Sequence, residues 1–594
     1  APRQAVLVLL DACRADRLSS YGYIRPTTPS IDALAREGVL FEEHYAQTTT
    51  TRSSLPSMLF SRYFIPPLFP SSDRVMLKAP GDLFRTIDPA AVSLPRALSR
   101  AGLRTAMISA HTWLREGTGF AALFDEAYDL SSRLDFDASR GYPRAEAVID
   151  FALGWMQAHA SEGFFLYLHL MDTHFPHYAD EDALRDMDPE LRAHPPLERF
   201  TKAGGVRDAS RPLDAREKAY LDALYDGDLS YVDGQLGRLF SWMRSRPEGR
   251  LVVVTADHGE GLMEAPGRFS HGLPPYEQVA HIPLVVWSPS GLTPARVGQT
   301  TEAVDLEPTI LSLLGVAPPE GASFDGRDLT PLARGSSLPP RPAVMVGGVR
   351  SGSYKLILRG EAADYLPGGS ADGAKTPELF DLGTDPLEVH DLAAQSPEIV
   401  SRLLGVWRDR LTAPHARYLS STTHQPPDVP FAISSRHFAL EPARPCTGET
   451  SHIERFFGSG EGWMRFCDPQ GDFLLAEGGA PPMSLSMHLP DGRYRVRLGL
   501  SGRVSVSIGG GGEREAAGGA FDPWSYFPWP VTVVDAGVAV VKGETLEIRM
   551  RPDAGSGPAA LEYVGFTPLH GATERETEDP ERLERLRSLG YVDE

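Results

Sequence analysis

Three short apolar runs, each followed within two residues by an aspartate, constrain the fold of this 594-residue chain more than any other feature. They occupy residues 5–10, 164–170 and 251–255, and each is too short for a typical helix. Continuous apolar runs of this length are typical of strands buried on both faces, as in a parallel sheet. Amphipathic stretches lie between them. Residues 1–335 therefore predict an α/β fold with a mixed, mostly parallel sheet between helices.

One amphipathic stretch, residues 28–38, carries the signals of a complete helix. Thr28 is a residue type that caps helices, Pro29 suits the first helical position, and Gly38 suits the end. Apolar residues lie three or four apart between these signals. The stretch predicts a helix with Thr28 as its N-cap.

The character of the sequence changes twice after residue 335. A stretch rich in Pro, Gly and Ser at 333–342 precedes a predicted strand at 354–358 and a predicted helix at 397–411. Farther on, alternating runs separated by Gly and Pro turns predict a β-sandwich, and the glycine run 509–512 predicts a hairpin turn. The predicted domains are a catalytic α/β domain at 1–335, a small C-terminal subdomain of that fold at 336–415, the β-sandwich at 416–570 and a helical tail at 571–594.

Charge and cysteine content exclude several classes of function. Lys and Arg number 58 against 79 Asp and Glu, a net charge of −21 that disfavours nucleic acid as a partner. No run reaches the ~18 apolar residues of a membrane-spanning helix. The 3 cysteines are too few for a disulfide scaffold, which leaves a Cys446–Cys467 bridge open. The first residue is Ala1, so a signal or anchor could precede it, and we expect a periplasmic or extracellular protein.

Carboxylates and a histidine stand directly after two of the predicted strands. Asp11 follows the first run, and Asp257 and His258 follow the third. Ligands gather at the carboxyl ends of strands in open α/β sheets, so these side chains are expected at one edge. Asp11 alone would as readily cap a helix. Carboxylate oxygens together with an imidazole nitrogen suit a divalent cation, so the two strands together predict a metal site.

A hydroxyl-rich turn at residues 48–57 leads into a predicted helix, whose N-terminal amides would favour an anion. The alternative is a simple Thr/Ser helix cap. Further residues with ligand or donor side chains follow the second apolar run or lie farther on: His169, Asp172, His174, His177 and His271. A single histidine is usually structural, whereas several near strand ends indicate a reactive site.

The order and spacing of these pieces resemble the sulfatase family, within the alkaline-phosphatase-like superfamily, over nearly all of the first 415 residues. Residues 9–16 resemble the family's opening Asp-Asp-x-Arg-x-Asp. Residues 378–388 resemble its ending, Glu-Leu-Tyr-Asp-Leu followed by Asp-Pro-x-Glu. Similar segments between them are Tyr21-Gly22, 28–35, His174-Phe175-Pro176, Asp257-His258-Gly259-Glu260, His271-Gly272, Tyr276-Glu277, 282–284, 305–310 and Asp325-Gly326. The resemblance implies an alkaline-phosphatase-like core that hydrolyses esters.

The family's nucleophile position differs in this chain. Sulfatases carry Cys, or sometimes Ser, in Cys-x-Pro-Ser-Arg and oxidise it to formylglycine. Aligning residues 59–63 with the family's Leu-Thr-Gly-Arg-Tyr puts Thr51 at this position and is the preferred register. Aligning Pro56-Ser57 with its Pro-Ser puts Ser54 there instead. Oxidised threonine would be a ketone rather than an aldehyde, so formylglycine is not expected.

Other departures remove charge from the site. The family's arginine falls on Leu55 or Met58, and Ala12 replaces its second aspartate. Lysines expected within residues 109–114 and at Ser270 are also missing. The candidate site residues that remain are Asp11, Thr51, Asp257 and His258. This set resembles the sites of mononuclear phosphotransferase and phosphodiesterase relatives that have a threonine nucleophile.

The residues and the resemblance together predict a metal-dependent hydrolase or transferase of sulfate or phosphate esters. One divalent ion, Ca²⁺, Mn²⁺, Mg²⁺ or Zn²⁺, is expected on that same set, where it would activate Thr51 for in-line attack. His174 and His271 are predicted to bind substrate oxygens or protonate the leaving group, and Arg14 to organise the strand end. The expected substrate is a sulfated or phosphorylated small molecule, glycan or lipid headgroup.

Two alternatives stay open. The first is a second metal ion held by Asp172, His177 and His271, as in two-metal relatives. The second is a catalytically inactive relative that binds anionic glycans through aromatic side chains of the β-rich part. These are Trp524, Tyr526, Phe527 and Trp529, for which packing in a core is the commoner role.

Overall fold

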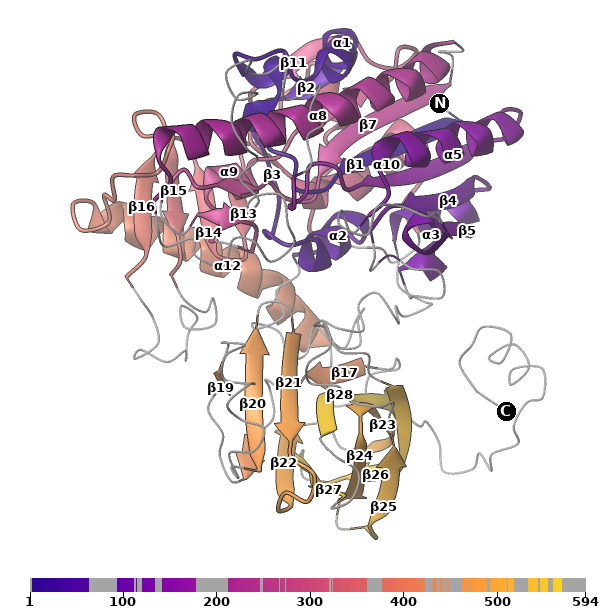
Figure 1. Cartoon of the computed structure of the whole chain (residues 1–594), viewed down its shortest axis with the longest axis vertical. Helices are drawn as coiled ribbons and strands as arrows, with labels where there is room; N and C mark the ends of the chain where they lie inside the picture. Colours follow the sequence, from indigo (N-terminus) through magenta and orange to yellow (C-terminus); the bar gives the residue numbers. More distant parts are fainter. Residues whose placement is uncertain are drawn as a thin grey trace. The chain divides into compact units, whose positions relative to one another are not determined.

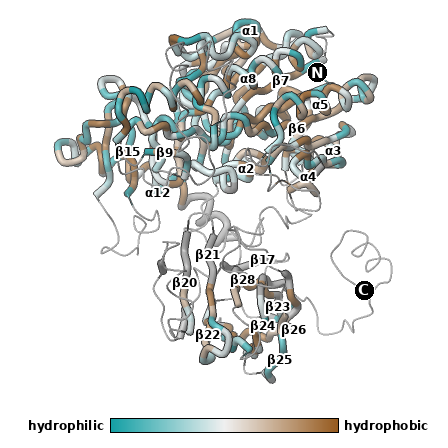
Figure 2. Tube along the Cα trace, in the orientation of Figure 1, coloured by the Kyte–Doolittle hydropathy of each residue, from teal (hydrophilic) through white to brown (hydrophobic). Residues whose placement is uncertain are grey.

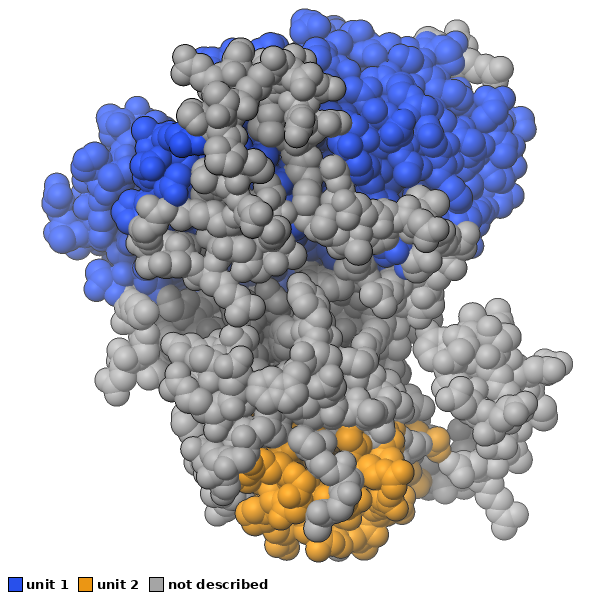
Figure 3. All heavy atoms as spheres, viewed as in Figure 1, with its two compact units in different colours: residues 1–65, 92–116, 121–414 blue, residues 66–91, 117–120, 415–594 orange. Residues whose placement is uncertain are grey.

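A computed structural model describes most of the chain, and contacts divide it into two compact units, coloured blue and orange in Figure 3. The first unit comprises residues 1–65, 92–116 and 121–414, and the second comprises 66–91, 117–120 and 415–594. The residues described are 3–63, 93–111, 114, 120–133, 142–177, 212–245, 249–265, 268–272, 274–319, 322, 324–359, 376–421, 431–434, 439–441, 446–447, 462–468, 471–488, 492–509, 511–517, 532–542, 545–553 and 559–568.

An eight-stranded sheet forms the centre of the first unit, in the order β11-β2-β10-β7-β1-β6-β4-β5 (Figure 1). The three apolar runs are its parallel central strands, β1 (Gln4–Leu10), β6 (Phe164–Leu170) and β7 (Arg250–Ala256), and every residue in them is buried. Their hydropathy can be followed in Figure 2. The predicted strands and mostly parallel sheet are thus confirmed. The other strands are β2 (Val39–Phe41), β4 (Arg104–Ser109), β5 (Glu126–Asp129), β10 (Leu284–Trp287) and β11 (Ala295–Val297), and β10 runs antiparallel to its neighbours.

Two groups of helices accompany this sheet. In one, α8 (Ala215–Arg244) packs on both α1 (Pro29–Glu37) and α5 (Ala145–Ala158). In the other, α10 (Leu306–Leu313) packs on both α2 (Thr51–Leu59) and α3 (Leu94–Arg100). Short elements complete the unit: η1 (Ala15–Arg17), η2 (Ser19–Tyr21), β3 (His44–Tyr45), η5 (Ala121–Leu123), α4 (Leu130–Arg133), β8 (Gly261–Leu262), β9 (Phe269–Ser270), α9 (Glu277–Ala280), β12 (Thr301–Glu302), η7 (Ala303–Asp305) and α11 (Thr330–Ala333).

Helix α1 begins at Pro29 with Thr28 at its N-cap position, as predicted, but another side chain binds its first amides. The Thr28 hydroxyl donates to Asp32 Oδ1 at 3.1 Å and makes no cap hydrogen bond. Asp233 of α8 instead accepts from the backbone amides of Ser30 and Ile31, both at 2.8 Å. Thr28 thus occupies the N-cap position, as predicted, but its side chain does not bind the first amides of the helix, because a carboxylate from a distant helix binds them.

A four-stranded antiparallel sheet follows within the first unit, in the order β13 (Ala343–Met345), β14 (Gly348–Ser351), β15 (Tyr354–Ile357) and β16 (Glu378–Asp381). The next helix, α12 (Pro397–Ser421), is fixed to it by Trp407, whose indole nitrogen donates to Met345 O at 3.0 Å. The predicted strand and helix of this region are present, and the helix continues beyond residue 411. The proposed domain boundaries at 335 and 415 stay predictions.

The second unit contains two sheets. One runs β19-β20-β21-β28-β23-β26, with β17 also on β28, and the other runs β18-β22-β27-β24-β25. Leu474 and Val496 of the first sheet share one core with Leu485 and Ile548 of the second, so the unit is a β-sandwich, as predicted. The strands are β17 (Phe431–Ser434), β18 (Ala439–Glu441), β19 (Cys446–Thr447), β20 (Trp463–Asp468), β21 (Gly471–Ala476), β22 (Met483–His488), β23 (Gly492–Ser501), β24 (Arg503–Ile508), β25 (Arg514–Ala517), β26 (Thr532–Val541), β27 (Thr545–Pro552) and β28 (Ala559–Pro568).

The remaining predictions for this part are tested unevenly. The glycine run at 509–512 connects the antiparallel strands β24 and β25, which confirms the predicted hairpin. The side chains of Cys446 and Cys467, the aromatic cluster at 524–529 and the predicted tail at 571–594 lie outside the described residues. Among the helices that the structure describes, none combines the length and apolarity needed to cross a membrane.

Candidate active site

The carboxyl ends of the central strands bring together residues from distant parts of the sequence. Leu10 pairs with both Leu170 and Ala256, so Asp11 and Asp257, the next residues on β1 and β7, leave the sheet side by side. The Ala12 amide donates to Asp257 Oδ1 at 3.3 Å and links the two turns. This edge of the sheet carries the reactive side chains, as the sequence predicted.

Asp11, Asp257 and His258 form a fully buried group whose ligand atoms converge. His258 Nδ1 lies 2.9 Å from the Gly259 carbonyl oxygen, which only accepts, so Nδ1 carries the proton and Nε2 has a lone pair. That Nε2 lies 3.4 Å from Asp257 Oδ2 and 3.8 Å from Asp11 Oδ1. Within the described part of the chain, neither of these carboxylate oxygens has a hydrogen-bond partner.

The electrostatics of this group favour a cation. Burial, together with the charge of His271, lowers the pKa of His258 to about 4, so the ring is neutral at pH 7. Burial and the charge of Asp11 raise the pKa of Asp257 to about 7. The pKa of Asp11 itself is held well below its usual value, because the charge of His174 and the hydrogen bond from His169 outweigh burial. Lone pairs that face one another in this way repel unless a proton or a cation lies between them, and the donor set fits a divalent metal ion.

Thr51 is the first residue of α2 and contacts this group. Its Oγ1 lies 3.3 Å from Asp11 Oδ2 and 3.2 Å from His258 Nε2. The Ser54 hydroxyl instead donates to Thr48 O at 3.0 Å and lies 3.0 Å from Thr48 Oγ1. Of the two candidate nucleophiles, the fold therefore brings Thr51 to the predicted metal ligands and turns Ser54 back to its own loop.

The two predicted catalytic histidines lie beside His258. The His271 ring stacks on the His258 ring with centroids 4.7 Å apart, and the His174 ring lies 4.6 Å from His271. Glu260, which is buried, lies 3.3 Å from His271 Nδ1 through Oε1 and accepts from the Phe175 amide through Oε2 at 3.1 Å. Glu260 thus holds both histidine-bearing loops.

The two histidines differ in charge. Burial would lower the pKa of His271, but the charge and hydrogen bond of Glu260 raise it above its usual value. Burial would raise the pKa of Glu260, but the charge and hydrogen bond of His271 lower it to about 2. For His174, burial prevails and lowers the pKa to about 4. The site therefore contains one histidine suited to donate a proton and one that is neutral.

Arg14 lies beside the site and is occupied by other groups. Its Nε and Nη2 bind both oxygens of Asp16 at 2.8 and 2.7 Å, and its Nη1 binds Glu264 and, at 3.0 Å, Glu260 O. These contacts tie the turn after β1 to the turn after β7. They are consistent with the predicted organising role rather than with contact to a reacting atom.

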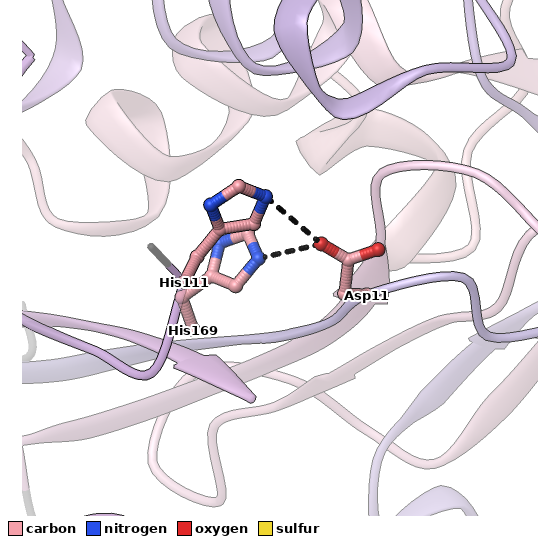
Figure 4. A group of neighbouring side chains, drawn as sticks. All are labelled: Asp11, His111 and His169. Carbon is pink, nitrogen blue, oxygen red and sulfur yellow. Dashed lines mark hydrogen bonds and ion pairs between the residues drawn. The ribbon is translucent and has the colours of Figure 1, made fainter. Parts of the chain in front are cut away.

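Two further buried histidines also reach Asp11 (Figure 4): His169, which the sequence analysis listed as a candidate without giving it a role, and His111, which it did not assign to the site. His169 Nε2 lies 2.9 Å and His111 Nε2 lies 3.8 Å from Asp11 Oδ2, and the three side chains form a second group that could hold a metal ion. His169 is on β6 and His111 follows β4, both strands of the central sheet. Their position at strand ends was the only available signal, since strand order is not visible in the sequence.

The alternative second metal site does not assemble. Asp172 Oδ1 accepts from the Ala145 amide at 3.2 Å, and His177 Nδ1 lies 3.4 Å from Asp228 Oδ2. Among the described residues, these two and His271 are not part of any group whose ligand atoms lie within 4.8 Å of one another.

Comparison with known proteins agrees with this geometry. The family model named Sulfatase matches residues 3–316, which is more than half of the chain. The chain belongs to the sulfatase family. The dog N-acetylgalactosamine-6-sulfatase is 26% identical to this sulfatase over 470 residues, an alignment that covers 68% of this chain and 84% of the dog protein.

Solved structures support the fold of this sulfatase. A Bacteroides thetaiotaomicron protein from work on glycosaminoglycan metabolism matches with a TM-score of 0.52 and 16% identity, over 71% of this chain and 99% of that one. The phosphonate monoester hydrolase of Silicibacter pomeroyi matches with a TM-score of 0.50 and 19% identity, over 71% and 96%. These folds confirm the predicted alkaline-phosphatase-like core, and family membership makes the chain a sulfatase-like ester hydrolase.

Proposed function

We propose that this sulfatase hydrolyses sulfate or phosphate esters by in-line attack of the Thr51 hydroxyl, in a site that contains one divalent metal ion. The position of Thr51 Oγ1, 3.3 Å from Asp11 Oδ2 and 3.2 Å from His258 Nε2, is the observation that carries the proposal. No other candidate nucleophile of the sequence analysis reaches these two side chains in the described part of the chain.

Asp11, Asp257, His258 and Thr51 would hold the metal ion. Two carboxylates, one neutral imidazole and one hydroxyl are compatible with Mn²⁺, Zn²⁺, Mg²⁺ or Ca²⁺. Bound there, a divalent ion would lower the pKa of the threonine hydroxyl and polarise an ester oxygen. Family membership supports a metal requirement, and the two carboxylate oxygens without hydrogen-bond partners support this position for the ion.

The side chains of this site divide the chemistry among them. Thr51 Oγ1 forms a bond to the sulfur or phosphorus as the bond to the leaving alcohol breaks, and Asp11 Oδ2 is placed to accept the hydroxyl proton. His271, whose pKa is raised by Glu260, donates its Nε2 proton to the leaving oxygen. Water then attacks the sulfur or phosphorus of the modified threonine as the bond to Thr51 Oγ1 breaks. Asp11 returns the proton to Oγ1, and the same imidazole nitrogen takes up the proton that water loses. Neutral His174 lies against His271 and orients it.

This mechanism requires an unmodified threonine. Formylglycine needs a side chain that oxidation converts to an aldehyde, and threonine gives a ketone. We therefore propose a covalent ester on Thr51 rather than a hydrated aldehyde as the nucleophile. The substrate we propose is a small molecule, glycan or lipid headgroup that bears a sulfate or phosphate ester, and we expect it to be met in the periplasm or outside the cell.

Two measurements test the proposal. The first is an activity panel of sulfate monoesters, phosphate monoesters and phosphate diesters, with and without Mn²⁺, Ca²⁺ or Zn²⁺. The second is mass spectrometry of enzyme quenched during turnover, because trypsin separates the candidates: Thr51 lies in the peptide 37–52 and Ser54 in 53–62. A sulfate or phosphate on Thr51 would support the proposal. A modified Ser54, or a formylglycine at that position, would contradict it.

A further inference from the structure

A buried chain of polar side chains extends from Asp11 into the core of the sheet. Tyr167, His169 and Asp11 each have a relative exposure of 0%. The Tyr167 hydroxyl lies 2.7 Å from His169 Nδ1, and His169 Nε2 lies 2.9 Å from Asp11 Oδ2. Tyr167 and His169 are two residues apart on β6, so both side chains project from the same face of the strand.

Proton placement along this chain follows from the donors and acceptors present. An ionised carboxylate only accepts, so His169 Nε2 must carry the proton that lies towards Asp11. In the tautomer with its proton on Nε2, His169 has a lone pair on Nδ1 that can accept from the Tyr167 hydroxyl at 2.7 Å. Every contact in the chain is thereby satisfied, and Asp11 Oδ2 is fixed by His169 while Oδ1 remains turned towards the His258 side.

We propose that His169, oriented by Tyr167, is a positioning residue that holds Asp11 in place as a metal ligand. The inference rests on the proposed metal site. Residues that orient a ligand through a hydrogen bond typically change metal affinity by about 10–100-fold when they are replaced. His169 has no direct contact to Thr51 among the described hydrogen bonds, so its effect passes through Asp11.

The competing arrangement is a second ion between Asp11, His111 and His169, whose ligand atoms also lie close together. In that case His169 Nε2 would be a ligand and would carry no proton. The distances favour positioning, because His169 Nε2 is at hydrogen-bonding distance from Asp11 Oδ2 at 2.9 Å whereas His111 Nε2 is 3.8 Å away. The number of bound ions distinguishes the two arrangements.

The experiment compares metal affinity and stoichiometry in full-length variants. Enzyme freed of metal by dialysis against a chelator is titrated with Mn²⁺, and with Ca²⁺ in a second series, against a chelating dye. Bound metal per chain is counted by mass spectrometry of the elements. His169→Leu removes the donor, His169→Gln keeps an N–H near the position of Nε2, and Tyr167→Phe removes only the orienting hydroxyl. Tyr128→Phe, which loses a hydroxyl bound to Glu126 at 2.6 Å on the edge strand β5 of the same sheet, is the matched control.

We expect one ion per chain in every protein, with affinity about 10–100-fold weaker in His169→Leu, within about threefold of wild type in His169→Gln, and intermediate in Tyr167→Phe. Tyr128→Phe should bind as the wild type does. Unchanged metal affinity in both His169→Leu and Tyr167→Phe would overturn the inference and leave the proposed function intact. The same conclusion would follow if the wild type bound two ions per chain and His169→Gln bound one. If His169→Leu does not fold, Tyr167→Phe decides alone. A wild type that binds neither ion would overturn the metal site itself.

Discussion

Replacing Thr51 by alanine should abolish most of the activity while the protein stays folded. The substitution removes the Oγ1 that contacts Asp11 Oδ2 and His258 Nε2 at 3.3 and 3.2 Å. Asp11 Oδ2 keeps its bond from His169, so we expect a loss of only about 1 kcal/mol in unfolding free energy. Loss of a nucleophile should lower kcat/KM by about 10³-fold or more, which corresponds to about 4 kcal/mol of transition-state stabilisation.

Two further variants serve as controls for Thr51→Ala. Thr51→Ser keeps the hydroxyl and loses one buried methyl group, so we expect activity within about tenfold of wild type and a stability loss of about 1 kcal/mol. Ser54→Ala removes the hydrogen bond to Thr48 O and the contact with Thr48 Oγ1, both at 3.0 Å. It should cost about 1–2 kcal/mol of stability and leave kcat/KM unchanged.

The assay is the initial rate with an aryl sulfate and an aryl phosphate at saturating metal, combined with denaturant unfolding of each variant. Thr51 and Ser54 predict opposite orders of activity in the two alanine variants. If Thr51→Ala keeps a tenth or more of the wild-type kcat/KM while Ser54→Ala loses a thousandfold, the assignment of the nucleophile is refuted.

Three other outcomes follow from the charges of the first unit. Removing metal with a chelator should abolish activity and lower the Tm, because Asp11 and Asp257 then face each other unscreened; Asp257→Asn should weaken metal binding at least tenfold in a dye titration. Glu260→Gln should move the alkaline limb of the kcat profile to lower pH, since Glu260 raises the pKa of His271. Burial raises the pKa of Asp233 to about 6, so its ionisation costs up to about 3 kcal/mol of stability as pH rises from about 4 to 6, and Asp233→Asn should remove that slope from pH-dependent unfolding curves.

The parts of the fold that depend on local pattern could be predicted from the sequence. Each central strand is a continuous apolar run because both of its faces are buried, and this pattern marked where β1, β6 and β7 end. The residues after two of those ends, Asp11 and Asp257, could therefore be placed at one edge of the sheet from the sequence alone. Family resemblance added the histidines His174 and His271, which lie beside His258.

The parts that depend on strand order and distant contacts could not be predicted. His111 and His169 reach Asp11 because the sheet places β6 next to β1 and β4 next to β6, an order that no local pattern specifies. The cap of α1 comes from Asp233, about 200 residues away in the sequence, although Thr28 is chemically suited to the task. The choice between Thr51 and Ser54 depends on where α2 begins relative to the end of β1. An alignment with the family's motif does not give the distance between these two elements in space.

Part of the negative charge of this chain, whose net charge is −21, lies at the candidate active site. Asp11, Asp257 and Glu260 are fully buried there, and the nearby Arg14 is bound to Asp16 and Glu264. An anionic ester approaching these carboxylates would meet repulsion that the family's lysines would normally offset, and this chain lacks those lysines at Ser270 and within residues 109–114. His271, whose pKa is raised by Glu260, supplies one compensating charge when it is protonated. A divalent ion held by Asp11, Asp257 and His258, as we propose, would supply the rest, and it would then help to admit the substrate as well as activate Thr51.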